Sequence, residues 1–334
     1  MATTVNKAFE EFMKESVNLD SGVVSAARKS RDNLLDNISE LSEEDGFFTL
    51  CSDFNEHFGS FARRTKCREL DDIDLMIGIS GNGATYNGSD PWDNIRIYVS
   101  SKDSAQNDCS RDDGTLNSTK VLNKFKKALE GVREYSRSEL HRNGEAVVLN
   151  LISKDWSFDI VPCFKTAVDD NGNEYYLIPN GSGNWKKTDP RKDREYVSSV
   201  NQEKSGRALE LIRLAKKWNR DTNVTTIPSY LLETLVVYFC ESCSDELSPC
   251  IDYRFRDALK YINNNIGVAV YDMKGIQGNI NYLSLSDRMA IANKAYDDYQ
   301  KAISAINYET TQKDMESSIS KWGEIFGSDF PEYD

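Results

Sequence analysis

The stretch FGSFARRTKCRELDDIDLMI, from Phe58 to Ile77, decides the fold of this chain. It places a Gly-Ser pair, Gly59 and Ser60, ahead of an Asp-x-Asp motif that opens an apolar run. Asp72 and Asp74 are two residues apart, so on a strand both carboxylates point to the same side. A small, flexible dipeptide before a helix can bring backbone N–H groups and a hydroxyl to a phosphate. The stretch therefore contains the groups needed to hold Mg²⁺ and a nucleoside triphosphate.

Length and composition are those of a globular protein with about two domains. The chain has 334 residues, of which 39% are hydrophobic and 28% charged, as in ordinary soluble proteins. Its longest apolar stretch, around Leu231–Phe239, is too short to span a bilayer. The first residues, MATTVNKAFEEF, lack the basic and then apolar layout of a signal peptide. We therefore expect a cytoplasmic protein without membrane association.

Charge and residue types restrict the chemistry. The net charge of −13 disfavours docking on a nucleic-acid backbone. The two histidines, His57 and His141, lie in no motif typical of a catalytic triad. Cys240, Cys243 and Cys250 form a cluster without a nearby fourth zinc ligand, so we interpret them as free thiols and keep zinc as the weaker alternative. Carboxylates with a metal ion are the better source of catalytic power.

The order of predicted elements indicates an α+β fold in the first part of the chain. Apolar residues at helical spacing predict helix from about Val5 to Leu41, with a break at 19–22, and a second helix over Cys51–Phe58. The turn signals are Asn143-Gly144 and Asp170-Asn171-Gly172, the latter followed by the strand-like EYYLIP. Four further strands are expected at 73–79, 95–99, 146–152 and 156–164, with a helix at 118–129 between them.

The second part of the chain reads as helical. From Asn201 onward the apolar residues keep a helical spacing, beginning with RALELIRLAKKWN. Further helices are predicted at 229–239, 253–263, 286–309 and 314–326. We therefore predict an α+β domain with N-terminal helices over residues 1–200 and a helical domain over residues 201–334. A nucleotide would fit in the cleft between them.

A third carboxylate would complete the metal site. In-line phosphoryl transfer favours two metal ions held by three carboxylates. The candidate is Asp159 in WSFDIVPCF, an apolar strand-like run in which a charge is costly unless it is paired or metal-bound. We expect two Mg²⁺ ions, with Mn²⁺ as the alternative, held by Asp72, Asp74 and Asp159. The competing interpretation is a set of solvated strand ends, and Asp71 would point away from its neighbour Asp72.

Several motifs together resemble one family. FGSF followed by LDDIDLMI is similar to the polymerase-β-like nucleotidyltransferase superfamily. FDIVPCF, YLIPNGSGNWKKTDP, LIRLAKKWNR, PSYLLETL and KWGEIFGSDFP resemble the bacterial cGAS/DncV-like nucleotidyltransferases. The resemblance extends from about Phe9 to Pro331. It implies a nucleotidyltransferase core with a mixed sheet and a long N-terminal helix, followed by a C-terminal helical bundle, with the active site in the cleft between them.

The resemblance also implies roles for single residues. It assigns triphosphate contacts to Gly59, Ser60, Lys216 and Ser229, and stacking on a nucleobase to Tyr230. Their chemistry agrees, since an ammonium and a hydroxyl suit a phosphate and an aromatic face suits a base. The alternatives are a solvated lysine, a helix N-cap serine and a half-buried core tyrosine. The helix phase leaves the neighbouring lysine, Lys217, as a second candidate.

The implied function is a Mg²⁺-dependent synthase that joins nucleoside triphosphates into a cyclic oligonucleotide and releases pyrophosphate. The product would act on an effector during anti-phage defence, and we expect a cyclic dinucleotide. The alternatives are a cyclic trinucleotide, transfer of one nucleotide to a protein, an RNA end or a small molecule, and a catalytically silent nucleotide-binding scaffold. The acidic balance predicts no DNA activator.

Overall fold

The computed structural model describes residues 2–100, 102–169 and 172–334. They form two compact units, and the chain passes between them four times. The sheet unit comprises residues 21–63 and 70–194, whereas the helical unit comprises the first 20 residues, 64–69 and 195–334. The predicted domain boundary at residue 200 stays a prediction. The predicted turn at 170–172 begins outside the described residues.

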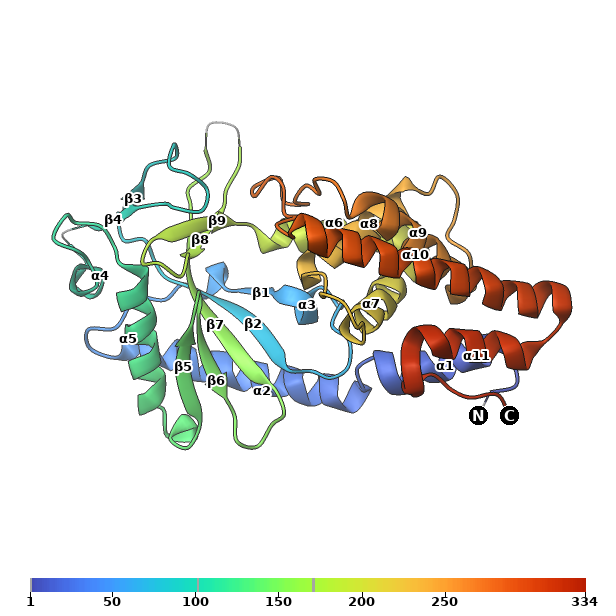
Figure 1. The fold of residues 1–334 in the computed structure, drawn as a ribbon. Coiled ribbons are helices and arrows are strands. Elements are labelled where there is room, and N and C mark those ends of the chain that lie inside the picture. The colour runs from blue at the N-terminus through green and yellow to red at the C-terminus, as the bar shows by residue number, and fades with distance from the viewer. Residues whose placement is uncertain (1, 101, 170–171) are drawn as a thin grey trace. The chain divides into compact units, whose positions relative to one another are not determined.

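The sheet unit is built on a mixed sheet with the strand order β1-β2-β7-β6-β5, extended by β8 and β9 from the end of β7 (Figure 1). The central strands β2 and β7 are parallel, and their other neighbours are antiparallel. The strands are β1 (Glu56–Phe58), β2 (Asp72–Gly78), β5 (Glu139–Asn143), β6 (Ala146–Asn150), β7 (Ser157–Lys165), β8 (Tyr176–Pro179) and β9 (Trp185–Thr188), with β3 (Thr85–Tyr86) and β4 (Ile97–Tyr98) as a separate pair.

The two faces of this sheet differ. Side chains alternate along β2, so Ile73 and Leu75 are buried on one face while Asp72 and Asp74 lie on the other. Helix α5 (Ser118–Gly131) contacts β5, β6 and β7 and buries one apolar stripe, as an amphipathic helix should. The remaining helical elements of the unit are α2 (Ser21–Glu40), α3 (Gly59–Ala62), α4 (Ser104–Asp108), η2 (Leu41–Glu43), η3 (Ser52–Phe54) and η4 (Arg133–Tyr135).

The helical unit joins both ends of the chain. Phe9 packs edge-on against Trp322 and Phe330, each with ring centroids 5.0 Å apart. Ala2 and Tyr333 form a parallel β-bridge beside this aromatic cluster. The elements of the unit are α1 (Val5–Phe12), η1 (Met13–Val17), α6 (Pro190–Glu203, which begins in the sheet unit), α7 (Arg207–Arg220), α8 (Ser229–Ser242), α9 (Ile251–Asn265), α10 (Leu285–Asn307), η5 (Tyr308–Gln312), α11 (Met315–Phe326) and η6 (Gly327–Asp329).

The α+β class, the mixed sheet and the C-terminal helices are confirmed. The predicted helix over Cys51–Phe58 is wrong, because this segment forms a single 3-10 turn followed by β1. Its backbone pairs with β2: the Cys51 N–H donates to the Gly78 carbonyl (2.8 Å), and the Asn55 side chain accepts from the Gly78 N–H (2.8 Å). Helix α6 was missed. Within the described ranges no helix is both long and apolar enough to cross a membrane.

Candidate functional site

The sheet unit brings the three predicted carboxylates onto one face. Asp74 and Asp159 are register partners on the parallel strands β2 and β7, and adjacent strands lie about 4.8 Å apart. Asp72 is two residues before Asp74, so it points to the same side. The neighbours Phe158 and Ile160 are fully buried on the opposite face, which fixes this orientation of Asp159. The sheet register therefore explains how residues so far apart in sequence come together.

Gly59 lies directly against one of these carboxylates. Phe58 is the register partner of Asp74, and the chain turns into α3 at the next residue. Gly59 has φ +70°, and a Cβ at this position would lie 1.7 Å from Asp74 Oδ2. Only glycine meets both requirements. Ser60 follows in the first turn of α3, so the Gly-Ser pair and the Asp-x-Asp motif form one structural element.

Carboxylates that approach one another on one face of a sheet repel, and a divalent cation between them would relieve this repulsion. The donor set of Asp72, Asp74 and Asp159 consists of hard oxygen ligands, which fit Mg²⁺. In the part of the chain that the structure describes, no three His, Cys, Asp or Glu side chains are gathered closely enough to form a ready metal site. The three carboxylates share a face, and two of them, Asp74 and Asp159, are register partners. Metal binding stays a prediction.

His57 lies on β1 beside this motif and points to the other face of the sheet. Burial lowers the pKa of His57, and the nearby Arg31 guanidinium, with its Nη1 3.3 Å from His57 Nδ1, lowers it further. On the carboxylate face of the same strand, Glu56 accepts hydrogen bonds from Arg194 (3.2 Å) and from the Tyr176 hydroxyl (3.4 Å). These contacts fix the strand from which the Gly-Ser turn begins.

The helical unit gathers Lys216 and Ser229 around a carboxylate that the sequence analysis did not identify. Glu233 of α8 is fully buried, and its Oε1 lies 2.5 Å from Lys216 Nζ on α7. The Ser229 hydroxyl donates to the same oxygen at 3.5 Å. Thr65 donates to Oε2 at 2.9 Å. One buried anion thus holds two of the predicted phosphate-binding side chains in one place.

Lys216 and Lys217 lie on different sides of α7 and have separate partners. Lys217 Nζ contacts Asp329 Oδ2 at 2.5 Å and Asp221 Oδ2 at 2.9 Å. Burial alone would lower the pKa of Lys217, but these two carboxylates outweigh it and raise the pKa. Lys217 therefore joins α7 to the C-terminal segment, whereas Lys216 lies beside Ser229 and Glu233.

Tyr230 is half-buried at the start of α8. Its hydroxyl donates to Asp272 Oδ1 at 2.6 Å. Lys274 Nζ lies over the Tyr230 ring, 4.2 Å from its centroid. Neither Asp272 nor Lys274 was identified from the sequence, because both come from an irregular loop about 40 residues downstream. Glu233 had a usable signal: a single carboxylate within the apolar run LLETLVV is expected to have a partner.

The cysteine cluster belongs to the core and loop of the helical unit. Cys240 is buried, which raises its thiol pKa to about 12. The Cys243 thiol donates to the Phe239 carbonyl at 3.4 Å. All three members, including Cys250, are free thiols. A thiol with a raised pKa is a poor nucleophile at neutral pH.

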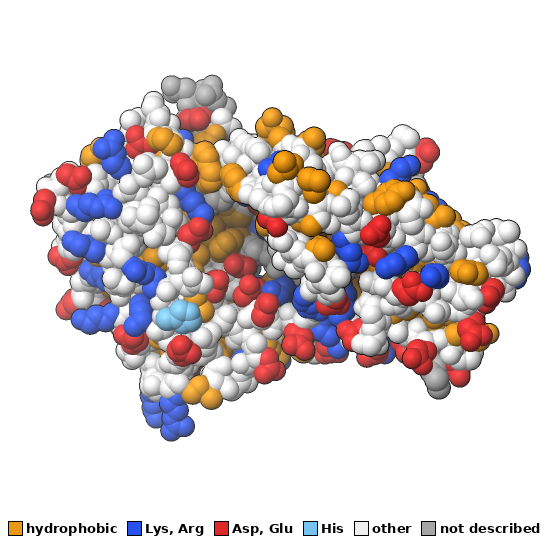
Figure 2. All heavy atoms as spheres, in the orientation of Figure 1, with side chains coloured by type: hydrophobic (Ala, Val, Ile, Leu, Met, Phe, Trp, Pro, Cys, Tyr) orange, Lys and Arg blue, Asp and Glu red, His pale blue; other side chains and the backbone are white. Residues whose placement is uncertain are grey.

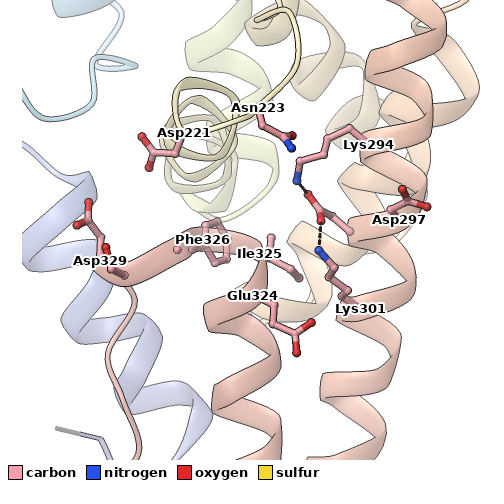
Figure 3. Close-up of a pocket in the computed structure, with 12 residues that line it drawn as sticks. Asp221, Asn223, Lys294, Asp297, Lys301, Glu324, Ile325, Phe326 and Asp329 are labelled. Carbon is pink, nitrogen blue, oxygen red and sulfur yellow. Dashed lines mark hydrogen bonds and ion pairs between the residues drawn. The ribbon is translucent and has the colours of Figure 1, made fainter.

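A cavity of about 490 Å³ lies in the helical unit between the end of α7, α10 and α11 (Figure 3). Both of its labelled lysines, Lys294 and Lys301, contact Asp298, whose side chain is fully buried. Acidic side chains also line it: Asp221, Asp297, Glu324 and Asp329. This lining is a poor match for a triphosphate. On the face drawn in Figure 2, basic side chains are interspersed with acidic ones and form no continuous track.

Known proteins resemble this chain in sequence and in fold. Residues 108–201 match the model of the Second Messenger Oligonucleotide or Dinucleotide Synthetase domain (SMODS). A probable cyclic nucleotide synthase from Bacillus cereus strain VD146 is 39% identical over 342 residues, which cover 100% of both chains. This similarity includes both units of the chain.

Solved structures show the same fold at low identity. The Escherichia coli MS115-1 protein CdnC, in complex with HORMA-deltaN, matches with a TM-score of 0.70 and 17% identity over 98% of each chain. The same protein with ATP matches with a TM-score of 0.69, at 17% identity and over 98% of each chain. Vibrio cholerae DncV in its GTP-bound form matches with a TM-score of 0.59 and 13% identity, over 98% of this chain and 86% of that one.

Proposed function

Because this chain belongs to the SMODS family of cGAS/DncV-like nucleotidyltransferases, which are cyclic nucleotide synthases, we propose that it joins nucleoside triphosphates into a cyclic oligonucleotide second messenger. The observation that carries the proposal is the shared register of Asp74 and Asp159, with Gly59 packed against the Asp74 carboxylate. The product that we favour is a cyclic dinucleotide, which would act on an effector in anti-phage defence.

In the proposed reaction, a ribose hydroxyl attacks the α-phosphorus of a nucleoside triphosphate. A new P–O bond forms, the bond between the α-phosphorus and the bridging oxygen breaks, and pyrophosphate leaves. Asp72, Asp74 and Asp159 would hold Mg²⁺, which when bound would lower the pKa of the hydroxyl and offset the charge of the triphosphate. Asp159 would also accept the proton of the hydroxyl.

The remaining residues would bind and orient the substrate. Gly59 and Ser60 would present backbone N–H groups and a hydroxyl to the phosphates, as small residues at a helix start can. Lys216 and Ser229 would supply a point charge and a donor to the same class of ligand. Tyr230 would present an aromatic face to a nucleobase, an interaction that tolerates different bases.

The proposal is tested by incubating the protein with each of the four radiolabelled nucleoside triphosphates and Mg²⁺, alone and mixed. We expect a small labelled product that resists phosphatase, and mass spectrometry of this product gives its bases and ring size. Label on a macromolecule would instead support transfer of a single nucleotide. Absence of any turnover by a folded protein, under conditions in which ATP and GTP bind, would support the scaffold alternative.

A further inference from the structure

The strongest unassigned feature is the loop that holds Tyr230. Asp272 has a fully buried side chain, and it accepts hydrogen bonds from backbone N–H groups as well as from the Tyr230 hydroxyl. Its Oδ1 accepts from the backbone N–H of Lys274 at 3.1 Å. Its Oδ2 accepts from the N–H groups of Ile276 and Gln277, both at 3.0 Å. One carboxylate thus organises the turn of residues 272–278 and holds the tyrosine of another helix.

The flanks of this loop are also tied by hydrogen bonds. The backbones of Val270 and Ile280 pair at 2.8 Å, and so do those of Asp272 and Gly278. The buried Asn281 side chain donates to two carbonyls of the segment after α9, both at 2.8 Å. These hydrogen bonds hold the backbone of the loop at several points, so the loop is preorganised. A rigid loop fixes the position of any side chain that is bonded to it.

The charge at Asp272 is favoured by these contacts. Burial alone would raise the pKa of Asp272, but the Lys274 charge, the Tyr230 hydroxyl and the backbone N–H groups outweigh it and lower the pKa. Lys274 Nζ lies 3.6 Å from Asp272 Oδ1 and 4.2 Å from the centroid of the Tyr230 ring. The lysine therefore takes one face of the ring while the carboxylate anchors its hydroxyl.

We propose that Asp272 is a positioning residue that anchors the Tyr230 ring, through its hydroxyl, for stacking on a nucleobase. The proposal rests on the function proposed above, because it needs Tyr230 to bind a base. A fixed ring loses less freedom when a base stacks on it, which favours binding. Asp272 thus acts through Tyr230 and does not touch the substrate.

The test compares Tyr230→Phe, Asp272→Ala and the double variant by the Kd of the α,β-methylene analogues of the four nucleoside triphosphates, which cannot undergo transfer. Tyr230→Phe keeps the aromatic face and loses the anchor. We expect each single variant to weaken binding about tenfold and the double variant to bind no worse than Asp272→Ala alone. Asp272→Asn keeps an acceptor for the hydroxyl and should fall between the wild type and Asp272→Ala.

Gln277→Ala is the matched control, because only the backbone of Gln277 takes part in the network. Its Kd values should equal those of the wild type. Additive effects of Tyr230→Phe and Asp272→Ala would overturn the proposal. If Asp272→Ala does not fold, the comparison of Asp272→Asn with Tyr230→Phe decides, and wild-type binding in both would overturn it. If Tyr230→Ala itself binds like the wild type, the base-binding role of Tyr230 fails instead.

Discussion

Lys216 Nζ lies 2.5 Å from Glu233 Oε1, in a part of the helical unit where Glu233 is fully buried and Lys216 is 8% exposed. A buried ion pair costs more to break than it contributes when formed, because the remaining charge is left without a partner. A triphosphate bound by Lys216 would compete with Glu233 for the same ammonium group. The pair therefore links the stability of the helical unit to the proposed binding of phosphate.

Glu233→Ala should destabilise the protein by about 3–5 kcal/mol, because it leaves Lys216 buried and unpaired. Urea unfolding followed by circular dichroism measures the change. Glu241→Ala is the control, since Glu241 lies on the same helix but is exposed, and it should cost less than about 1 kcal/mol. An equal loss in both variants would contradict the importance of the buried pair.

Substitution of the two adjacent lysines, Lys216 and Lys217, should have different effects on the KM for nucleoside triphosphates. Lys216→Met leaves the buried Glu233 without its ammonium partner, and Lys217→Met loses two ion pairs with partly exposed carboxylates, so both should lower the free energy of unfolding. Only Lys216→Met should raise the KM for nucleoside triphosphates, by about tenfold or more. Initial rates of pyrophosphate release at varied triphosphate concentration provide the comparison. A raised KM in Lys217→Met alone would reverse the assignment.

Gly59→Ala should lower kcat by about 100-fold or more, because the added methyl group would displace the Asp74 carboxylate. Gly46→Ala is a close control: Gly46 also has positive φ, +77°, but no atom lies within 4 Å of its would-be Cβ. The control carries the backbone strain alone, so it should lose stability and keep its turnover. Equal activity of the two variants would show that the contact with Asp74 is unimportant.

Asp74→Asn should reduce turnover by about 1,000-fold or more, because a neutral amide is a poorer ligand for a divalent cation than a carboxylate. Asp71→Asn changes the exposed neighbour that precedes β2 and should keep most of the activity. Activity is measured as labelled product per enzyme over a range of Mg²⁺ concentrations. Full turnover by Asp74→Asn would rule out the proposed metal site.

His57 should make the protein less stable in mild acid. Its pKa in the folded state is lowered from 6.5, so its contribution to stability is present above 6.5 and is lost as the pH falls through the folded pKa. His57→Gln should therefore lose less stability than the wild type between about pH 7 and 5. Since the chain has two histidines, proton NMR with this variant assigns both titrations. A His57 pKa above 6.5 would contradict the prediction.

Secondary structure could be predicted from the sequence where the apolar residues of a single segment have a clear strand or helix spacing. Alternation along β2 and helical spacing along α5 gave these elements close to their observed ends. The helix predicted over Cys51–Phe58 is wrong although its apolar residues have helical spacing. The backbone of this segment pairs with β2 instead, and such long-range pairing cannot be read from the local pattern. Helix α6 was missed because PRKDREYVSSVNQE has few apolar residues to show a period.

The residues of the candidate site likewise differ in how far the sequence predicts them. Asp72 and Asp74 are two residues apart, and this spacing predicted a shared face, while Gly59 was predicted from its place in a small dipeptide before a helix. Glu233 and Asp272 could not be paired with their partners from sequence, because these contacts join separate helices and loops. Only folding brings such groups within hydrogen-bonding distance. Buried polar side chains without a local partner are therefore the positions to examine first in a related sequence.

The aromatic contacts of Phe9 with Trp322 and Phe330 also affect the order in which the protein can assemble. These partners are separated by about 300 residues, so at 5–20 residues per second a ribosome needs roughly 15–60 s to make the second after the first. During this time the apolar face of α1 lacks these two aromatic partners, although α9, which also contacts α1, is made earlier. The aromatic cluster around Phe9 can therefore be completed only late in translation.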